Sequence, residues 1–344
     1  MTPFDSSSSG AGFLRRRFLQ IMGTTAAGWG LSGNVTAQPA SSKAEKAPEQ
    51  LRIGYQKSAV NLVILKQQGV LEKRFPNTRI QWAEFPAGPQ LLEALSVGSL
   101  EFGLTGDSPP VFAQAAGKDL LYVGAEPPKP DSSAILVLNG SPLKTLADLK
   151  GRKIALQKGS SAHYLLVRAV EKAGLLWSDI QPIYLPPADA RAAFERKSVD
   201  AWAIWDPFYA AIELAIKPRA LATGRDLSSN NSFYLAAGVF ATQHSQALGV
   251  LLDELSRADL YAQTQRKDTI KLISSFSGLD AGVVSLFIQR RPKSPVSPLS
   301  AATVADQQRV ADAFLKLGLI PKPIKVADIV WRPEAARLAQ LDRK

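Results

Sequence analysis

The chain has 344 residues, of which 46% are hydrophobic and 21% are charged, and its formal net charge at pH 7 is +11. This length and composition predict a globular protein with a large core and favour two domains over one. The chain has no cysteine, which excludes disulfides and attachment to lipid through a cysteine, and no apolar run is long enough to span a bilayer as a mature segment.

The basic balance suits a small anion, a nucleic acid or an anionic lipid as partner, and composition alone does not choose among them. The lysines and arginines are scattered, however, with no dense basic run and no aromatic residues interleaved among them. Nucleic-acid surfaces usually have both features, so we expect no nucleic-acid partner.

Residues 1–37 have the order of a twin-arginine export signal. The run RRRFL at 15–19 precedes a mildly apolar stretch, and small residues follow up to Ala37, where we expect cleavage. Residues 38–48 are small, polar and Pro-containing, which indicates a flexible leader. We therefore expect a periplasmic protein. Without its signal the chain keeps 38 basic and 29 acidic side chains, a net charge of +9.

Strand and helix patterns alternate in two series along the chain. In the first, alternation or short apolar runs predict strands at 51–55, 79–85, 102–105, 120–125 and 134–138, and helical spacing predicts helices at 59–72, at 90–97 and from 106–110 onward. In the second, strands are predicted at 153–157, 181–185 and 199–204, with helices that end near 173, 195 and 214. Such alternation is typical of parallel sheets with helices on both faces, so the predicted fold class is α/β with two lobes.

The C-terminal third differs from these series. A strand is predicted at 233–240, followed by helices at 246–261, 265–276, 281–288 and 303–317, and the Pro/Ser-rich run 291–298 is expected to be a surface loop. A tail of this kind is expected if the chain returns to the first lobe and packs helices on it. We therefore assign 49–136 to the first part of lobe I, 137–232 to lobe II, and 233–344 to the return into lobe I and the C-terminal helices.

Four strand-to-helix junctions carry small, polar or aromatic residues. In α/β sheets, ligands bind beyond the carboxyl ends of the strands, where these junctions fall. The most informative junction is KGSSAHYLL at 158–166, in which Ser160 or Ser161 would be the N-cap of a helix. A helix start offers unpaired N–H donors and the positive end of the helix dipole, which together bind anions. The alternative is that these serines only cap their own helix.

Several motifs occur in the order found in a known family. They are GYQK at 54–57, EFPAGPQ at 84–90, TGD at 105–107, VG at 123–124, EPPKP at 126–130, QKGSS at 157–161, PADARAAF at 187–194, DAWAIWDP at 200–207 and WRP at 331–333. In these motifs, over nearly all of the mature chain, the sequence resembles the periplasmic aliphatic sulfonate-binding proteins of ABC importers. The resemblance implies a two-lobed periplasmic binding protein of type II, with two crossover strands, a helical C-terminal tail and a ligand held between lobes that close on it.

The resemblance also implies a binding role without catalytic residues, cofactor or metal. The partners would be an alkanesulfonate and the membrane permease of an ABC importer, and the protein would act as a monomer in sulfur acquisition. Carried over position by position, the resemblance places the substrate contacts at Gln56, Gly106, Asp107, Ser160, Ser161, His163, Trp205 and Asp206.

The chemistry of these residues supports some contacts more than others. A sulfonate is anionic at any working pH and offers three acceptor oxygens, so the serines and nearby backbone amides suit it as donors. Trp205 would supply an apolar wall for an alkyl chain. A carboxylate repels the anion, so Asp107 and Asp206 are interpreted as helix caps, or as partners of Lys57 or His163, rather than as direct ligands.

Two further residues have alternative interpretations. His163 is interpreted as a donor to the anion, and the alternative is a surface position in the first turn of its helix. Glu126, in a loop expected beside the cleft, is a candidate contact for the importer.

The main rival function is an enzyme on the same architecture, which is shared with a desulfinase and with thiamine-precursor proteins. The resemblance places the chemistry of that desulfinase on a cysteine, and this chain has none. Ser161 and His163 lie too close together on one helix start for a Ser-His-Asp arrangement, and His163 and His244 are too far apart in sequence to indicate a metal site. Among binding proteins, taurine, nitrate or a thiamine precursor are alternative ligands to linear alkanesulfonates.

Overall fold

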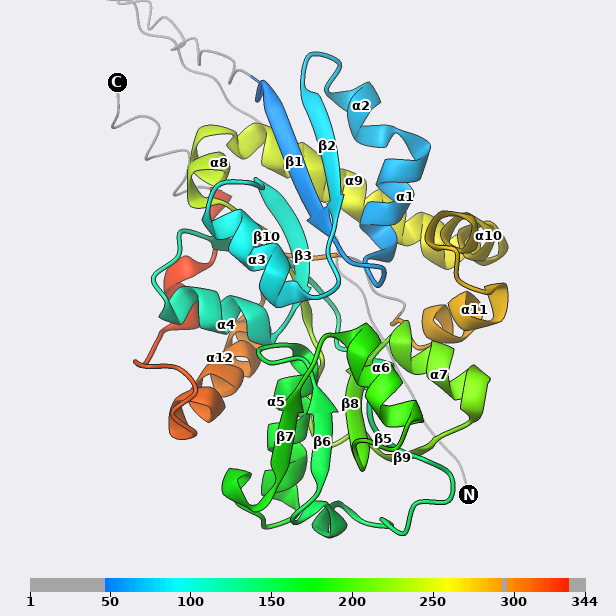
Figure 1. Ribbon diagram of the computed structural model, residues 1–344. Coiled ribbons are helices and arrows are strands. Elements are labelled where there is room, and N and C mark those ends of the chain that lie inside the picture. Colours follow the sequence, from blue (N-terminus) through cyan, green and yellow to red (C-terminus); the bar gives the residue numbers. More distant parts are fainter. Residues whose placement is uncertain (1–46, 293–295, 334–344) are drawn as a thin grey trace, which may run out of the picture. The chain divides into compact units, whose positions relative to one another are not determined.

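The computed structural model describes residues 47–292 and 296–333; the predicted export signal and most of the predicted leader lie outside these ranges. Within them, the strands form two five-stranded sheets (Figure 1). Sheet A has the strand order β2-β1-β3-β10-β4, and sheet B has the order β7-β6-β8-β5-β9. We call sheet A and the helices packed on it lobe I, and sheet B with its helices lobe II.

The two sheets are built in the same way. Sheet A contains β1 (Gln50–Tyr55), β2 (Arg79–Glu84), β3 (Phe102–Gly106), β4 (Leu121–Glu126) and β10 (Ser232–Ala236). Sheet B contains β5 (Ser133–Val137), β6 (Lys153–Leu156), β7 (Gln181–Tyr184), β8 (Ala201–Trp205) and β9 (Arg219–Thr223). In sheet A, β1 is parallel to β2 and β3, and β10 is antiparallel to both of its neighbours. In sheet B, β6 is parallel to β7 and β8, and β5 is the antiparallel strand.

The chain crosses between the sheets twice. β5 follows β4 along the chain but lies in sheet B, and β10 follows β9 but lies in sheet A. We call residues 127–132 the first crossover and residues 224–231 the second. The predicted α/β fold with two crossovers is confirmed, but the predicted boundary after residue 136 moves to a position before Ser133. All five residues of β5 are buried, and a strand that is buried on both faces does not reveal in its sequence which sheet it joins.

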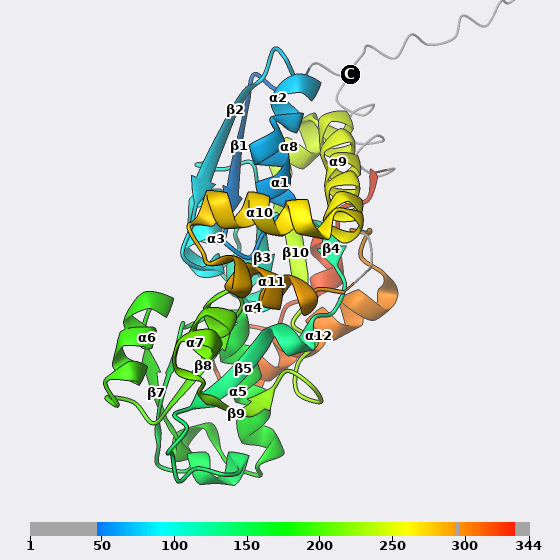
Figure 2. The same cartoon turned by 90° about the vertical axis from the view of Figure 1, so that its right-hand side faces the viewer.

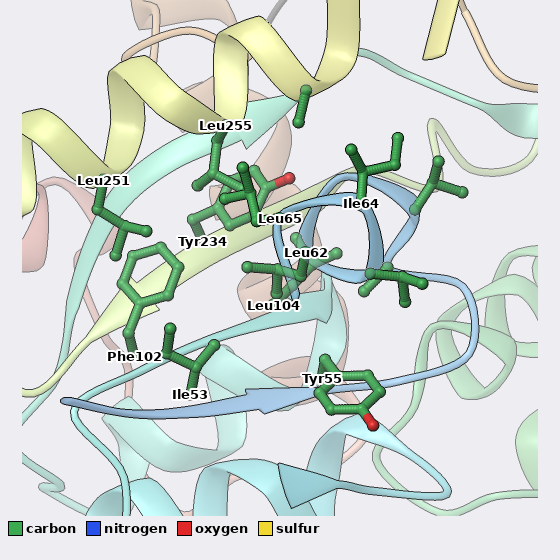
Figure 3. Close-up of a cluster of buried hydrophobic side chains, with 14 of the residues drawn as sticks. Ile53, Tyr55, Leu62, Ile64, Leu65, Phe102, Leu104, Tyr234, Leu251 and Leu255 are labelled. Carbon is green, nitrogen blue, oxygen red and sulfur yellow. The ribbon is translucent and has the colours of Figure 1, made fainter. Parts of the chain in front are cut away.

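Helices cover both faces of sheet A. The helices α1 (Val60–Gln68), α9 (Ser245–Thr264), α10 (Arg266–Ser277) and α11 (Ala281–Gln289) share one apolar cluster with its strands, whereas α3 (Gly88–Ser96), α4 (Ser108–Ala115) and α12 (Ala301–Lys316) share another. Neighbouring residues of β10 alternate between these clusters, with Tyr234 in the first and Phe233 in the second, because strand side chains alternate between faces. In the first cluster, Leu251 and Leu255 of α9 lie near Phe102 (Figure 3).

Two helices of lobe I are short. The predicted helix at 59–72 is divided at Gly69, whose φ of +58° ends α1 before α2 (Val70–Arg74) begins. Glycine adopts this left-handed conformation without strain, which makes it a usual helix terminator. The helix α8 (Gly238–Gln243) follows β10 and leads into α9.

In lobe II, α5 (Ser161–Lys172) packs in one apolar cluster with sheet B, and α6 (Pro187–Glu195) and α7 (Phe208–Ile216) pack in another. The 3₁₀ turns are η1 (Pro130–Ser132), η2 (Leu146–Leu149), η3 (Trp177–Asp179) and η4 (Val326–Ile329). None of the helices in the part of the chain that the structure describes combines the length and apolarity needed to cross a membrane.

Candidate ligand-binding site

Four strand-to-helix junctions, two from each sheet, line one cavity of about 50 Å³. Parallel strands present their carboxyl ends at one edge of their sheet. The junctions after β1 and β3 therefore lie together at one edge of sheet A, and those after β6 and β8 lie together at one edge of sheet B. Asp107 and His163 do not line this cavity. The predicted site residues that do line it are Gln56, Gly106, Ser160, Ser161, Trp205 and Asp206.

The two lobes touch at Gly106. A Cβ atom on Gly106 would lie 1.9 Å from Oγ of Ser161 and 3.2 Å from its Cβ. Gly106 ends β3 of lobe I, and Ser161 begins α5 of lobe II. The opposite lobe therefore leaves no room for a side chain at this position, and the structure has the lobes closed over the cavity.

The helix α5 begins at the cavity, and the serine at its N-cap position makes no hydrogen bond to the first turn of the helix. Ser160 is the N-cap residue, but its side chain makes no cap bond, and its Oγ donates to the Gln157 carbonyl at 2.8 Å. The interpretation that the serines only cap their own helix is therefore wrong for Ser160. The first-turn N–H groups and the positive end of the α5 dipole lie where Ser160 and Ser161 line the cavity.

Asp206 lies on the cavity wall and is nearly buried. Its Oδ1 accepts from the Ala210 N–H at 3.0 Å, as a residue that caps a helix start does. Nη1 of Arg290 contacts Oδ1 at 3.0 Å and Oδ2 at 3.3 Å. Burial raises the pKa of Asp206 to about 7, and the Arg290 charge opposes this rise. The cap role is present, but the ion partner is Arg290 rather than Lys57 or His163.

Asp107 is buried but has no cap role. It precedes α4, yet its side chain makes no cap bond. The reason is local, because two of the first three residues of α4 are Pro109 and Pro110, which have no N–H to donate. Its carboxylate instead accepts from Ser108 Oγ at 2.9 Å, and burial raises its pKa.

His163 is enclosed by aromatic rings and does not reach the cavity. Its side chain is fully buried, with ring centroids of Trp177, Phe314 and Tyr184 at 5.2, 5.3 and 5.8 Å. Nδ1 accepts from the Gly159 N–H at 3.2 Å. Burial lowers the pKa of His163 to about 4, so the ring is neutral at pH 7. The structure thus places His163 neither at the anion, as interpreted from sequence, nor on the surface, but in the core, in the first turn of α5.

The pKa of His163 predicts an acid-sensitive fold. Between about pH 6.5 and 4 the unfolded chain binds a proton that the folded chain does not, so stability should fall by up to about 1.4 kcal/mol per pH unit as pH decreases. His163→Asn keeps an acceptor for Gly159 but cannot titrate in this range. Urea unfolding at pH 7.0, 5.5 and 4.5 should give a shallower pH dependence for this variant. Equal slopes for wild type and variant would contradict the assignment.

Lys129 was missed from the sequence. It lies in the first crossover and lines the cavity, and its Nζ donates to Glu126 Oε2 at 2.9 Å and to Ser232 Oγ at 2.7 Å. Its backbone carbonyl accepts from Asn230 in the second crossover at 3.1 Å. Lys129 therefore links both crossovers at the cavity. The available signal was its place in the EPPKP motif at 126–130.

Arg291 was expected in a surface loop but is largely buried at the cavity. It pairs with Glu126 at 3.3 Å and with Asp259 of α9 at 3.5 Å. Burial alone would raise the pKa of Glu126, but Arg291 and Lys129 hold it at about 2. The interpretation of Glu126 as an importer contact is wrong, because its carboxylate is enclosed by these cations and by Tyr234, whose hydroxyl donates to it at 3.0 Å.

Comparison with known proteins places the chain in a family. Residues 84–252 match the family model described as NMT1/THI5 like. The aliphatic sulfonates-binding protein of Escherichia coli (strain K12) is 49% identical over 90% of this chain and 98% of its own length. The chain belongs to the aliphatic sulfonate-binding protein family. The resemblance found in the sequence motifs is confirmed.

Solved structures of aliphatic sulfonate-binding proteins have the same fold. The periplasmic aliphatic sulphonate binding protein SsuA from Escherichia coli matches with a TM-score of 0.77 and 51% identity, over 83% of this chain and 93% of that chain. The alkanesulfonate-binding protein SsuA from Xanthomonas axonopodis pv. citri, bound to MOPS, matches with a TM-score of 0.81 and 51% identity, over 83% of this chain and 99% of that chain. The predicted two-lobed binding-protein fold is confirmed.

Enzymes also use this fold. The desulfurization enzyme DSZB matches with a TM-score of 0.62 over 86% of this chain and all of that chain, at 16% identity. At this identity the likeness shows the fold alone. Within residues 47–292 and 296–333, no three His, Cys, Asp or Glu side chains are grouped so that they could hold a metal ion.

Proposed function

We propose that this protein captures aliphatic sulfonates between its two lobes in the periplasm and delivers them to the permease of an ABC importer for sulfur acquisition. The observation that carries the proposal is a cavity between the lobes in which helix starts from both lobes meet two largely buried cations, Lys129 and Arg291. The family supports it, because its Escherichia coli member is named for aliphatic sulfonates and its Xanthomonas member was solved with MOPS, which is a sulfonate.

The cavity suits the sulfonate headgroup. The group carries a permanent charge, so recognition requires donors and positive charge but no proton transfer. Ser161 offers a hydroxyl donor beside the start of α5, and Lys129 offers an ammonium. The hydroxyl of Ser160 already donates to the Gln157 carbonyl. Gln56 is held at the wall by a bond from its Nε2 to the Leu104 carbonyl at 3.2 Å. Gln56 and Lys129 are already held by hydrogen bonds, so fewer side-chain rotations are lost when the ligand binds.

A second cavity can take the rest of the ligand. It has a volume of about 310 Å³ and shares Gln56, Ser58 and Trp205 with the headgroup cavity. Its other walls include Phe85 and Phe208 and are largely apolar. The rings of Trp205 and Phe208 meet edge to face at 5.9 Å. An alkyl chain that leaves the headgroup cavity past Trp205 would bury its surface here.

Calorimetric titration of the mature protein tests this function. The ligands are a series of linear alkanesulfonates, with taurine, sulfate and nitrate as competitors of different size and charge. The buffer must be free of sulfonates such as MOPS. We expect the tightest binding for an alkanesulfonate, because only this ligand fills both cavities. If taurine or nitrate binds more tightly than every alkanesulfonate, the substrate class is different, and if no sulfonate gives heat, the proposal fails.

Replacing both serines should weaken binding without unfolding the protein. Ser160→Ala with Ser161→Ala removes the Ser161 hydroxyl donor at the cavity and the Ser160 hydroxyl that holds the Gln157 carbonyl, but keeps the backbone N–H groups of α5. Because a hydrogen bond to a charged group is lost, we expect a loss of about 2 kcal/mol, or about thirtyfold in Kd. Ser178→Ala, at an exposed serine of η3, is the control. Unchanged Kd in the double variant would mean that the headgroup binds elsewhere.

The catalytic alternative lacks support in the cavity. The wall residues from the described part of the chain include no histidine, since His163 is directed into the aromatic cluster. A serine nucleophile needs a base within hydrogen-bond reach. We therefore propose binding without turnover, and incubation with an alkanesulfonate followed by mass analysis should return the ligand unchanged.

A further inference from the structure

Arg290 is the point at which a helix of lobe I reaches two carboxylates of lobe II. It is the C-cap residue of α11, which packs in the first apolar cluster of sheet A through Val284 and Phe287. Figure 2 shows α11 beside α7, and the two helices are in contact. The side chain of Arg290 therefore bridges the lobes.

The Arg290 guanidinium is held by three side chains of one short segment. Nη1 contacts both carboxylate oxygens of Asp206, and Nη2 forms an ion pair with Glu213 of α7. The guanidinium carbon lies 4.0 Å from the centroid of the Tyr209 ring. Arginine is suited to such a position because its planar group pairs with carboxylates and stacks on rings at the same time. These contacts hold α11 of lobe I against α7 of lobe II.

The negative charge of Asp206 disfavours an anion in the cavity, and Arg290 compensates this charge. Asp206 lines the headgroup cavity, and a carboxylate there would repel a sulfonate. Arg290 does not line the cavity. It therefore supplies the opposite charge from outside, without occupying the space that the ligand needs.

We propose that Arg290 is a positioning residue for anion binding, which neutralises Asp206 on the cavity wall and fastens α11 to α7 in the closed state. This inference rests on the proposed function and adds a residue that the sequence motifs do not include. The adjacent Arg291 has a different role, because it pairs with Glu126 and Asp259 inside lobe I.

The groups around Asp206 determine how a test should be designed. Arg290 and Glu213 face its carboxylate, and Lys129 and Arg291 line the same cavity. Burial raises the pKa of Asp206 to about 7 even with Arg290 in place. Without Arg290 the carboxyl should hold its proton to higher pH, so repulsion of the ligand should appear as the pH increases.

The test compares Arg290→Met with Arg290→Met/Asp206→Asn, using hexanesulfonate and calorimetry at pH 6.0 and 8.5. Asparagine keeps an oxygen that can accept from the Ala210 N–H. We expect Arg290→Met to bind about tenfold more weakly than wild type at pH 6.0 and several times more weakly again at pH 8.5, mainly through faster dissociation. Adding Asp206→Asn should remove the extra loss at pH 8.5. Lys129 and Arg291 are present in both variants, so their own titration cancels in the comparison.

Glu213→Gln is the matched control on α7. It removes one ion pair of Arg290 at a partly exposed carboxylate and leaves the cavity wall intact, so we expect a change in Kd of less than about threefold. Binding by Arg290→Met as tight as wild type at both pH values would overturn the inference. A loss that Asp206→Asn leaves unchanged at pH 8.5 would reject the neutralising role. Absence of hexanesulfonate binding by wild type would instead contradict the proposed function.

Discussion

Gly106→Val should abolish measurable sulfonate binding and leave the protein folded. A Cβ at this position would lie 1.9 Å from Ser161 Oγ, and the two additional methyl groups of valine cannot be accommodated by rotation of one hydroxyl. The φ angle of Gly106 is not in the left-handed region, so β3 itself tolerates a side chain. The clash therefore exists only between closed lobes. We expect a loss of affinity of a thousandfold or more, which corresponds to about 4 kcal/mol.

Calorimetry and small-angle scattering distinguish a failure to close from a failure to fold. Gly106→Val should have the thermal stability of wild type but the same scattering profile with and without ligand, whereas wild type should contract on binding. Gly249→Val adds the same side chain on α9, where the new Cβ meets no atom within 4 Å apart from the neighbouring backbone of its own helix, and should bind normally. In a milder pair, Ser161→Gly should restore part of the affinity lost in Gly106→Ala. Normal binding by Gly106→Val would mean that the closed contact is not part of the bound state.

Lys129→Met should damage both stability and binding. Its Nζ pairs with Glu126 Oε2, and both side chains are nearly buried. Removing one partner of a buried ion pair costs about 3–5 kcal/mol, because the remaining charge is left without full compensation. Arg291 still pairs with Glu126, which places the expected loss near the lower end of that range. The ligand also loses a cationic donor on the cavity wall, so affinity should fall by about a hundredfold or more.

A double variant separates these two effects. Lys129→Met with Glu126→Gln removes one positive and one negative charge, so the net charge of the cluster is that of wild type. Urea unfolding should show recovery of most of the stability, because no uncompensated carboxylate remains. Titration with an alkanesulfonate should still show weak binding, because the ammonium donor is absent. Wild-type affinity in the double variant would show that Lys129 acts only through the net charge and does not contact the ligand.

The junction residues could be predicted because their signals are local. Alternating and helical periodicities identify where β3 and β6 end. In α/β folds the carboxyl ends of parallel strands lie at the same edge of the sheet, where ligands bind. Ser160 was singled out in this way as a residue of a helix start. The resemblance to the family then pointed to Gly106, Trp205 and Asp206 at the other junctions, and all four residues line one cavity. The family motifs reinforced these positions but did not say which side chain faces the ligand.

The failures concern buried polar groups. His163 follows two serines in a helix start and looks like a donor in sequence, but Trp177 and Phe314 close around its ring. Asp107 looks like a cap in sequence, but the prolines after it remove the donors that it would cap. The second case could have been predicted from local chemistry. The first could not, because Phe314 comes from a helix 151 residues further along the chain.

The amino-acid sequence by itself determined the α/β class, the four junctions and the family, since these depend on periodicity and on motifs a few residues long. Only the tertiary structure decided which partner each buried charged side chain contacts. Lys129 with Ser232, Arg291 with Glu126, and Arg290 with Asp206 join residues that are 84 or more positions apart. A charged side chain is tolerated in the interior only when a partner meets it there, and which partner meets it depends on how the sheets and helices pack.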